Sequence, residues 1–388
     1  MTEILLTIFF ISVLLFFLGS GIWVALSMIG VSAIGMMLFT SRPVGDAMAT
    51  TIWGTSSSWT LTALPLFVWM GEILFRTKLS ENLFKGLSPW MQKLPGGLIH
   101  VNVVGCALFA AISGSSAATV ATVGKMSIPE LRKRNYPEKI LLGSLAGSGT
   151  LGLLIPPSII LIIYGVAVQE SIAKLFIAGI IPGIMIALIF MCYVVIWSLI
   201  NKKSMPKIVE EYSFFEKIKR SKQLLPVILL ISGVIGSIYT GVATATEAAS
   251  LGVIGALILS YFQKSLTLET FKISLLGATK TSCMIAFILA GSTFLSLAMG
   301  FTGLPRNLAL WIENMNLSPY VLIFVLMIFY IILGMFLDGI SAVVLTMAII
   351  EPMIRQAGFD MIWFGIFLVI VVEMAQITPP VGFNLFVL

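Results

Sequence analysis

The chain has 388 residues, of which 59% are hydrophobic and only 10% are charged, whereas about 25% of the residues in a soluble domain are charged. This composition excludes a soluble globular protein and indicates an integral membrane protein. The formal net charge of +6 does not point to a nucleic-acid partner, because the basic residues lie in short loops, where they orient membrane spans.

Several stretches of at least 24 residues contain no Asp, Glu, Lys or Arg. They cover residues 4–41, 47–71, 94–124, 140–169, 175–201, 223–246, 281–305 and 314–337. A helix needs about 20 apolar residues to cross the hydrocarbon core of a bilayer. These stretches are continuous and rich in Leu, Ile, Ala and Phe, without the alternation of barrel strands. The sequence therefore predicts an all-α membrane protein.

The first part of the chain also contains two segments that are not simple spans. Residues 76–97 mix basic and apolar side chains in a pattern that predicts an amphipathic arm helix on the membrane surface. The charge-free stretch 98–124 then lies between two basic segments, so it must return to the side from which it starts. It predicts a re-entrant helical hairpin with its tip near Ser113–Ser116. An ordinary span is the alternative.

Two loops contain about half of the basic residues and set the topology. They are Lys125, Arg132, Lys133, Arg134 and Lys139, followed by Lys202, Lys203, Lys207, Lys217, Lys219, Arg220 and Lys222. Both loops are expected to be cytoplasmic, because positively charged loops stay on that side of the membrane. One span at about 140–163, an outer turn near Glu170 and a returning span at about 177–199 fit between them.

Short motifs recur in the same order at an offset of about 220–226 residues. The matched segments include Ser113–Ala117 with Asp338–Ala342, and Ile155–Pro157 with Thr378–Pro380. The charges do not repeat, because the counterpart of the basic loop 125–139, at about 350–363, contains Arg355 as its one basic residue. Similar spans with opposite loop charge predict an inverted-topology repeat, which is an architecture of many secondary transporters.

The repeat divides the chain into three parts. Residues 1–200 form the first copy, with the arm helix 76–97, the hairpin 98–124 and a broken helix 140–163. Residues 201–222 form a cytoplasmic linker. Residues 223–388 form the second copy, with an arm at 301–318, a hairpin at 319–350 and a broken helix at 361–388. Eight residues follow Pro380, whereas a whole span follows the first Pro-Pro pair. A final span of about 35–40 residues is therefore expected to be missing from this sequence.

Four groups of Gly, Pro, Ser and Thr interrupt the apolar stretches, and the repeat pairs them. Glycine permits unusual backbone conformations, and proline leaves a carbonyl without its helical partner. Free carbonyls and hydroxyls make a hard-oxygen cage suited to Na⁺, while half-helix N-termini present amides to a carboxylate. We therefore expect two Na⁺ sites with an anionic substrate between them near the bilayer midplane. The alternative is that these small residues only allow close helix packing.

The candidate residues fall into three sets. The first Na⁺ site is expected to contain Ser113, Gly114, Ser115, Ser116, Gly149, Thr150, Gly152 and Pro156. The second Na⁺ site is expected to contain Asp338, Gly339, Ser341, Thr378 and Pro379. Substrate contacts are expected from Ser116, Thr119, Ser158, Ser341 and Asn384. No catalytic residue is predicted, and no metal besides Na⁺.

Three acids and the single histidine require separate interpretation. Asp338 lies at the second hairpin tip, where a buried charge should meet a cation, a proton or a polar partner. Glu373 fits the same role or a position near the membrane edge. Glu247 opens the predicted span 246–263, where a carboxylate stabilises a helix N-terminus. His100 is expected at the surface, at the entry to the first hairpin.

At these residues the sequence resembles the DctM-like large membrane subunit of tripartite ATP-independent periplasmic (TRAP) transporters. The resemblance rests on SGSSAATVATVG at 113–124, Gly152–Ser158, 239–249, Asp338–Ala342 and Ile377–Gly382, and it extends over essentially the whole chain. It implies Na⁺-driven import with an elevator-like movement of the hairpin-bearing domain. It also implies ion sites at Ser113–Ser116 with Gly149–Pro156, and at Asp338–Ser341 with Thr378–Pro379.

The resemblance further implies partners and a location. A soluble periplasmic binding protein would deliver a small carboxylate, such as a C4-dicarboxylate or a sialic acid, and a small membrane subunit would complete the permease. The chain would cross the lipid bilayer of a bacterial inner membrane several times. The alternatives are a stand-alone Na⁺/dicarboxylate symporter of related fold and, more distantly, an ion channel. An enzyme is not expected, because no nucleophile is paired with a histidine base.

Overall fold

The computed structural model of the chain describes residues 2–76, 79–206, 212–222, 224–303, 307, 318–335, 337–379 and 382–388. Every regular element within these residues is a helix, which confirms the all-α prediction. Four of the described helices are long and apolar enough to span a membrane, and the number rises to seven when each of three bent helix pairs counts as one span. The chain is therefore built as a multi-span helical membrane protein.

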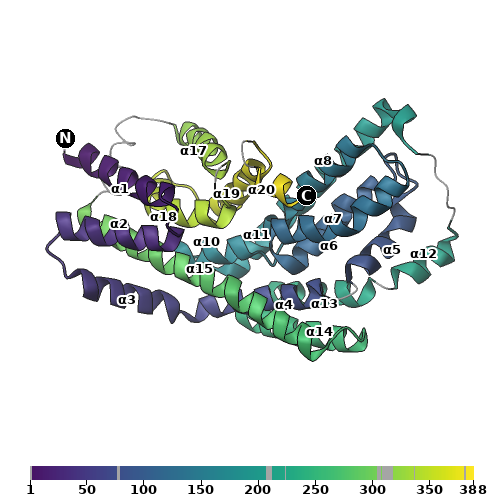
Figure 1. The fold of residues 1–388 in the computed structure, drawn as a ribbon, viewed down its shortest axis with the longest axis horizontal. Helices are drawn as coiled ribbons and strands as arrows, with labels where there is room; N and C mark the ends of the chain where they lie inside the picture. Colours follow the sequence, from purple (N-terminus) through teal and green to yellow (C-terminus); the bar gives the residue numbers. More distant parts are fainter. Residues whose placement is uncertain are drawn as a thin grey trace.

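Within the described ranges, the helices follow one another with no strand between them (Figure 1). The first half contains α1 (Thr2–Gly19), α2 (Val24–Phe39), α3 (Val44–Ser56), η1 (Trp59–Thr62), α4 (Ala63–Phe75), α5 (Leu79–Met91), α6 (Ile99–Ser113), α7 (Ser116–Lys133), α8 (Glu138–Gly149), α9 (Leu151–Leu154), α10 (Ile159–Ala167) and α11 (Ile172–Ile200). The remainder contains η2 (Lys202–Ser204), α12 (Phe214–Ser221), α13 (Leu225–Tyr239), α14 (Ala245–Phe262), α15 (Leu268–Thr302), α17 (Pro319–Gly334), α18 (Gly339–Gln356), α19 (Met361–Gln376) and α20 (Phe383–Val387).

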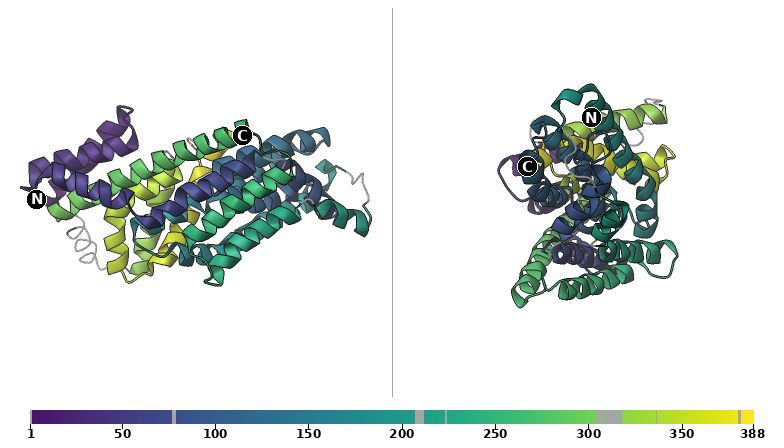
Figure 2. Two further views of the ribbon diagram at one scale, coloured as in Figure 1. Left: turned by 90° about the horizontal axis from the view of Figure 1, so that it is seen from below. Right: turned by 90° about the vertical axis from the view of Figure 1, so that its right-hand side faces the viewer.

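A long helix, α15, runs along the molecule and packs against α2, α3 and α4 (Figures 1 and 2). Small residues permit this close packing, as is common between helices in membranes. A Cβ atom placed on Gly291 of α15 would lie 2.8 Å from the carbonyl oxygen of Ala25 on α2. Because the helix α14 also packs against α4, the helices α2, α4, α14 and α15 form one connected unit, which we call the scaffold.

The chain reverses direction between α6 and α7, where the sequence predicts a hairpin. Gly114 joins the two helices in the left-handed conformation (φ +57°), which glycine adopts without strain. The Ser115 hydroxyl accepts a hydrogen bond from the Ala118 amide and so caps α7. The helices α6 and α7 also pack against each other, so they form a helical hairpin whose second helix continues to Lys133, and its re-entrant character stays a prediction. Its depth in a membrane stays a prediction.

The second copy of the repeat is described in part. The helices α17 and α18 occupy the predicted hairpin 319–350, and their connection includes Asp338, whose carboxylate caps α18. The predicted arm at 301–318 falls mainly on residues outside the described part of the chain. The predicted broken helix 361–388 consists of α19 and the short α20, and Pro380 between them also lies outside the described residues.

The broken helix of the first half links two charged ends of the molecule. The helices α8 and α9 continue into α10 through a bend of 41°. Arg132 pairs with Glu138 at the start of α8, whereas Arg355 donates to the Val168 carbonyl at 3.0 Å, just beyond the end of α10. Arg132, in the last turn of α7, and Arg355, in the last turn of α18, therefore lie at opposite ends of this helix, which is the arrangement that oppositely oriented halves predict. Their sides of the membrane stay a prediction.

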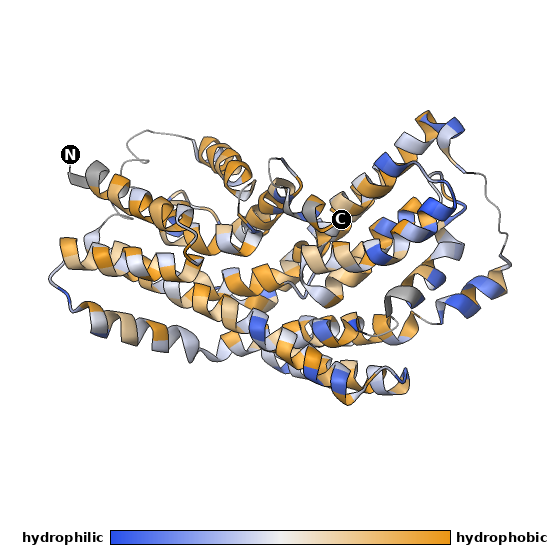
Figure 3. Ribbon diagram, in the orientation of Figure 1, coloured by the Kyte–Doolittle hydropathy of each residue, from blue (hydrophilic) through white to orange (hydrophobic). Residues whose placement is uncertain are grey.

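The basic C-terminal end of α7 and the basic helix α12 of the predicted linker lie at the same end of the molecule. Figure 3 shows hydrophilic residues along α12 and at the C-terminal end of α7, while apolar residues cover most other helices. The arm helix α5 lies beside α12, and the Trp90 indole donates to the Ser221 hydroxyl at 2.7 Å. This shared end is what a single cytoplasmic face would require.

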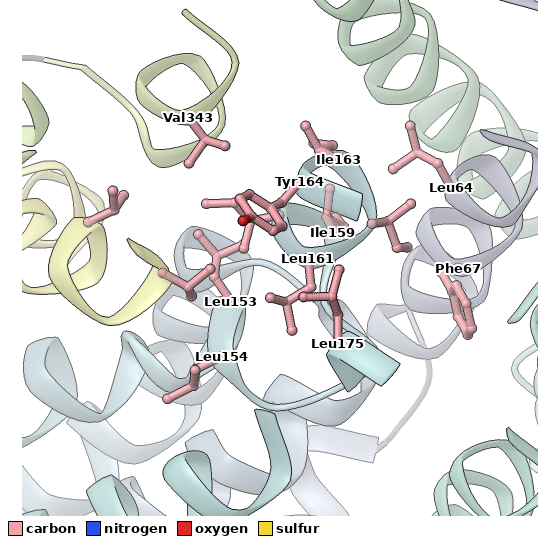
Figure 4. Close-up of a cluster of buried hydrophobic side chains, with 14 of the residues drawn as sticks. Leu64, Phe67, Leu153, Leu154, Ile159, Leu161, Ile163, Tyr164, Leu175 and Val343 are labelled. Carbon is pink, nitrogen blue, oxygen red and sulfur yellow. The ribbon is translucent and has the colours of Figure 1, made fainter. Parts of the chain in front are cut away.

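The core is centred on α10, whose side chains point toward α4, α11 and α18. Figure 4 shows this cluster, with Ile159, Leu161 and Tyr164 among the labelled residues. The Tyr164 hydroxyl donates to the Met361 carbonyl of α19 at 2.7 Å and so ties the two halves together. Lipid tails are as apolar as these side chains, so tight packing and hydrogen bonds, rather than transfer out of water, stabilise such a core.

Candidate functional site

The two predicted hairpin tips line one cavity, although more than 200 residues separate them in the sequence. The cavity has a volume of about 1240 Å³. One wall comes from the scaffold helices α2, α4 and α15. The opposite wall contains residues from both predicted ion sites and from α19, namely Ser113, Ser115, Ser116, Asp338, Gly339, Ser341 and Gln376. Tertiary folding thus brings the two sequence motifs to the same place.

The first tip is an oxygen-rich turn. The hydroxyls of Ser113 and Thr119 are 2.8 Å apart, and the Thr119 hydroxyl donates to the Ser115 carbonyl at 2.8 Å. Ser113 and Ser115 face the cavity, whereas Thr119 is fully buried behind them. Serine hydroxyls and a carbonyl gathered at the connection between α6 and α7 are hard-oxygen ligands of the kind that suit Na⁺.

The broken helix packs directly against this tip. A Cβ atom on Gly152 would lie 2.6 Å from the Ser115 carbonyl oxygen, so only glycine allows this approach. The amide of Ile159 donates to the Gly114 carbonyl at 3.3 Å. Of the predicted segment Gly149–Pro156, Gly152 therefore lies directly beside Ser115 and Ser116, and a role of the segment in ion binding stays a prediction. Within this segment, Gly149 packs against Val120 of α7, and the Thr150 hydroxyl donates to the Gly147 carbonyl at 2.6 Å.

Ser158 has a different role from the predicted substrate contact. It is fully buried and caps α10 by accepting from the Leu161 amide, and its hydroxyl donates to the Leu153 carbonyl. Both bonds are local, because Ser158 follows the Pro156-Pro157 pair and begins a new helix. The hydroxyl of Ser158 is thus committed to the helix break, and the residue does not line the cavity.

The second tip meets the cavity at the N-terminus of α18. The carboxylate of Asp338 accepts from the Ser341 amide at 3.2 Å. A Cβ atom on Gly339 would lie 2.5 Å from the Gln376 side-chain nitrogen, so the amide of Gln376 packs against the glycine. Asp338, Gly339 and Ser341 therefore form a compact group with Gln376, which is the member of the fourth interruption that the structure brings to this tip.

The predicted site residues Thr378, Pro379 and Asn384 do not line the cavity, and neither do Gly114, Thr119, Gly149, Thr150, Gly152 and Pro156. The Thr378 hydroxyl donates to the Met374 carbonyl at 2.8 Å within its own helical turn, and Pro379 is exposed. Asn384 is fully buried on α20, which packs against α7 and α8. Its amide has no hydrogen-bond partner among the described residues. Sequence spacing could not show that these residues lie away from the cavity, because the chain changes direction at the break after Gln376.

The structure corrects one expectation and confirms another. The prediction that His100 lies at the surface is wrong: its side chain is fully buried, and its Nε2 is 2.8 Å from the Pro95 carbonyl oxygen, because the turn before α6 folds over it. Glu247 forms a capping box with Thr244 at the start of α14, and the Thr244 amide donates to its carboxylate at 2.8 Å. The structural interpretation of Glu247 is thus confirmed.

Charged residues outside the three predicted sets also reach the site. Glu72 of α4 and Lys280 of α15 line the scaffold wall of the cavity. Glu72 pairs with Arg76 at 2.9 Å. Glu373 of α19 is buried, and its carboxylate accepts from the Ser116 hydroxyl at 2.7 Å. The sequence signal for Glu373 was its position in an apolar stretch, but only folding shows that it meets the first tip.

These residues fit a hard monovalent cation better than a transition metal. The atoms that could coordinate a cation at both tips are hydroxyl, carbonyl and carboxylate oxygens. Glu373 contributes a buried carboxylate oxygen that accepts no hydrogen bond from the described residues. Such oxygens suit Na⁺, whereas thiolate and imidazole select softer ions. A cation at each tip would make the cavity between them favourable for an anion.

Comparison with known protein families gives a match over residues 9–388 to the family described as "Tripartite ATP-independent periplasmic transporter, DctM component". The chain is 33% identical to the C4-dicarboxylate TRAP transporter large permease protein DctM of Pseudomonas aeruginosa, over 92% of this chain and 82% of that protein. It is 30% identical to the isethionate TRAP transporter permease protein DctMQ of Oleidesulfovibrio alaskensis, over 96% of this chain and 58% of that protein. The chain is also 30% identical to the sialic acid TRAP transporter large permease protein SiaM of Vibrio cholerae, over 95% of this chain and 86% of that protein.

Proposed function

Because the chain belongs to the DctM family of TRAP transporters, in which its relatives are large permease proteins, we propose that it is the permease subunit of a Na⁺-coupled importer of a small organic anion. The substrate class is a carboxylate such as a C4-dicarboxylate or a sialic acid. The single observation that supports coupling is the shared cavity, in which the oxygen-rich tips Ser113–Ser116 and Asp338–Ser341 meet.

The electrostatics of the cavity support this coupling. Its lining contains the acids Glu72 and Asp338 and the base Lys280, and Glu72 is paired with Arg76, so these groups offer an anion no net positive charge when the tips are empty. A Na⁺ ion at each tip adds positive charge beside the substrate. The differential affinity for the anion then depends on cation occupancy, which is the thermodynamic basis of symport.

The movement we propose follows from the two walls of the cavity. The cavity residues of the scaffold wall, from α2, α4 and α15, include none of the predicted ion-site residues, whereas the opposite wall contains both tips. An elevator-like displacement of the tip-bearing wall against the scaffold would expose the cavity first to one side of the membrane and then to the other. The inverted halves supply two similar end states for this movement.

The partners belong to the same proposal. A periplasmic binding protein would deliver the anion, and a small membrane subunit would pack against the permease in a bacterial inner membrane. The isethionate relative has the name DctMQ and is longer than this chain, which is consistent with a second component in one polypeptide.

Reconstitution tests the proposal. The chain and a small subunit are placed in proteoliposomes, and uptake of a labelled C4-dicarboxylate and of sialic acid is measured with an inward Na⁺ or K⁺ gradient. We expect uptake with Na⁺ and the binding protein, and little with K⁺. Uptake independent of the Na⁺ gradient would refute the coupling. Unassisted uptake would favour a stand-alone carrier, and rapid gradient-independent flux would favour a channel.

Substitutions at the tips refine this test. Ser116→Trp or Ser341→Trp should raise the Na⁺ concentration required for uptake and slow it, because each bulky side chain would enter the cavity. Membrane insertion should be unaffected. Ser20→Trp, at an exposed helix end, is the matched control. Unchanged Na⁺ dependence in both tip variants would remove these residues from the ion sites.

A further inference from the structure

A buried acid lies at the interface between the two halves of the molecule. Glu373 on α19 is only 4% exposed. One of its oxygens, Oε1, accepts a hydrogen bond from the Ser116 hydroxyl at 2.7 Å. The other, Oε2, is buried and has no hydrogen-bond partner among the described residues. Half of this carboxylate is therefore unsatisfied in the structure.

Burying a carboxylate with an unsatisfied oxygen costs free energy, which a purely structural role would not explain. An ionised side chain within a membrane costs several kcal/mol unless it is paired, and intramembrane acids are for this reason rare and usually functional. No basic side chain pairs with Glu373 within the described residues. A glutamine could accept the same hydrogen bond from Ser116 without the charge, so the hydrogen bond alone does not explain the acid.

The position of α19 relates this acid to the ion sites. Gln376, three residues after Glu373 and thus on the same side of the helix, packs against Gly339 at the second tip. Glu373 meets the first tip through Ser116. Ser116, Gly339 and Gln376 all line the cavity. The helix α19 therefore lies between the two tips and presents its acid to the first of them.

We propose that Glu373 is the anionic member of the cation site at the first hairpin tip, where its free oxygen and charge stabilise a bound Na⁺ beside Ser116. The inference rests on the proposed Na⁺ coupling and makes it more specific. The site combines residues of both halves, because Ser116 belongs to α7 and Glu373 to α19. Binding of the cation at the first tip would then also fix the helix that contacts the second tip.

A competing explanation is that Glu373 only positions the Ser116 hydroxyl. The two roles differ in what the substitutions should do. If the charge binds the cation, Glu373→Gln weakens Na⁺ binding strongly even though the hydrogen bond can be retained, and Ser116→Ala weakens it less. If Glu373 acts only through Ser116, then Ser116→Ala has an effect at least as large as Glu373→Gln.

The test measures Na⁺ binding without transport. The purified chain in detergent is heated over a series of NaCl concentrations, with KCl keeping the ionic strength constant, and the half-saturating Na⁺ for thermal stabilisation is determined. We expect Glu373→Gln to raise this concentration about tenfold or more, because one unit charge close to the ion is lost in a poorly solvated site. Ser116→Ala should raise it by a few-fold. Glu269→Gln, which neutralises an exposed acid at the start of α15, is the matched control and should leave it unchanged.

The outcomes separate the two proposals. If the unsubstituted chain shows no stabilisation specific to Na⁺, the proposed coupling fails and this inference fails with it. If the unsubstituted chain responds and Glu373→Gln responds at the same Na⁺ concentration, the inference is overturned while the coupling stands. If Glu373→Gln does not fold, Glu373→Asp decides the question: a half-saturating Na⁺ within about threefold of the unsubstituted value supports a role for the charge, and a rise of tenfold or more refutes it.

Discussion

The replacement of Gly152 by alanine tests the contact between the broken helix and the first hairpin tip. A Cβ atom at this position would lie 2.6 Å from the Ser115 carbonyl oxygen and 2.7 Å from the Ser116 Cα. Both atoms belong to the backbone, so neither can move aside by rotation of a side chain. The Gly152→Ala variant must therefore shift the tip or the broken helix.

The size of the effect follows from two opposing terms. Overpacking typically costs 1–3 kcal/mol, and a clash with backbone belongs at the upper end, about 3 kcal/mol. Alanine regains up to about 1 kcal/mol through its higher helix propensity. The net destabilisation should be about 2 kcal/mol, which corresponds to a roughly 30-fold change in an equilibrium constant. Because Ser115 and Ser116 move, the half-saturating Na⁺ should also rise.

Gly143→Ala provides the matched control, since Gly143 lies on α8 and a Cβ atom there meets nothing within 4 Å. This variant should be neutral or slightly stabilising. Thermal unfolding of both purified variants is measured in detergent with and without Na⁺. If Gly152→Ala unfolds at the same temperature as Gly143→Ala and requires the same Na⁺ concentration, the close approach of the broken helix to the tip is refuted.

Three further predictions concern single contacts. Asp338→Asn should retain the cap of α18, because asparagine caps helices as well as aspartate, but it should raise the half-saturating Na⁺ concentration several-fold. Asp338→Ala should raise it too and should in addition destabilise the chain by about 1 kcal/mol. Equal Na⁺ requirements in the unsubstituted chain and both variants would contradict a role for the charge. Tyr164→Phe removes the 2.7 Å bond to the Met361 carbonyl and should cost about 1 kcal/mol in thermal unfolding, with an unaltered Na⁺ requirement. Lys280→Gln should raise the KM for the anionic substrate several-fold in proteoliposome uptake, whereas Lys272→Gln, on the same helix but outside the cavity lining, should not; the same KM in both would exclude Lys280 from anion binding.

The sequence was most informative where the cause of a structure is local. Charge-free apolar stretches predicted membrane helices, because a span must be apolar over its own length. The reversal at Gly114 and the break around Pro156 were predicted from residues that act on their own backbone, through a left-handed φ and a missing amide. The cap of α14 by Thr244 and Glu247 is equally local, and the structure confirms it.

The limits of the sequence lie in contacts between distant segments. Repeat matching predicted that the tips at Ser113–Ser116 and Asp338–Ser341 correspond, but it could not show that both line one cavity. It placed Thr378, Pro379 and Asn384 in the site by analogy with the first half. In the structure, the chain after α19 turns away from the cavity.

Composition and local residue chemistry thus determined that this chain forms membrane helices, where it reverses and where its helices break. Tertiary structure alone decided that His100 is buried, that Lys280 reaches the cavity and that Glu373 meets Ser116. The physical reason is that a helix fixes the positions of its own residues within a few turns, whereas the partners of a side chain depend on which other helices pack against it.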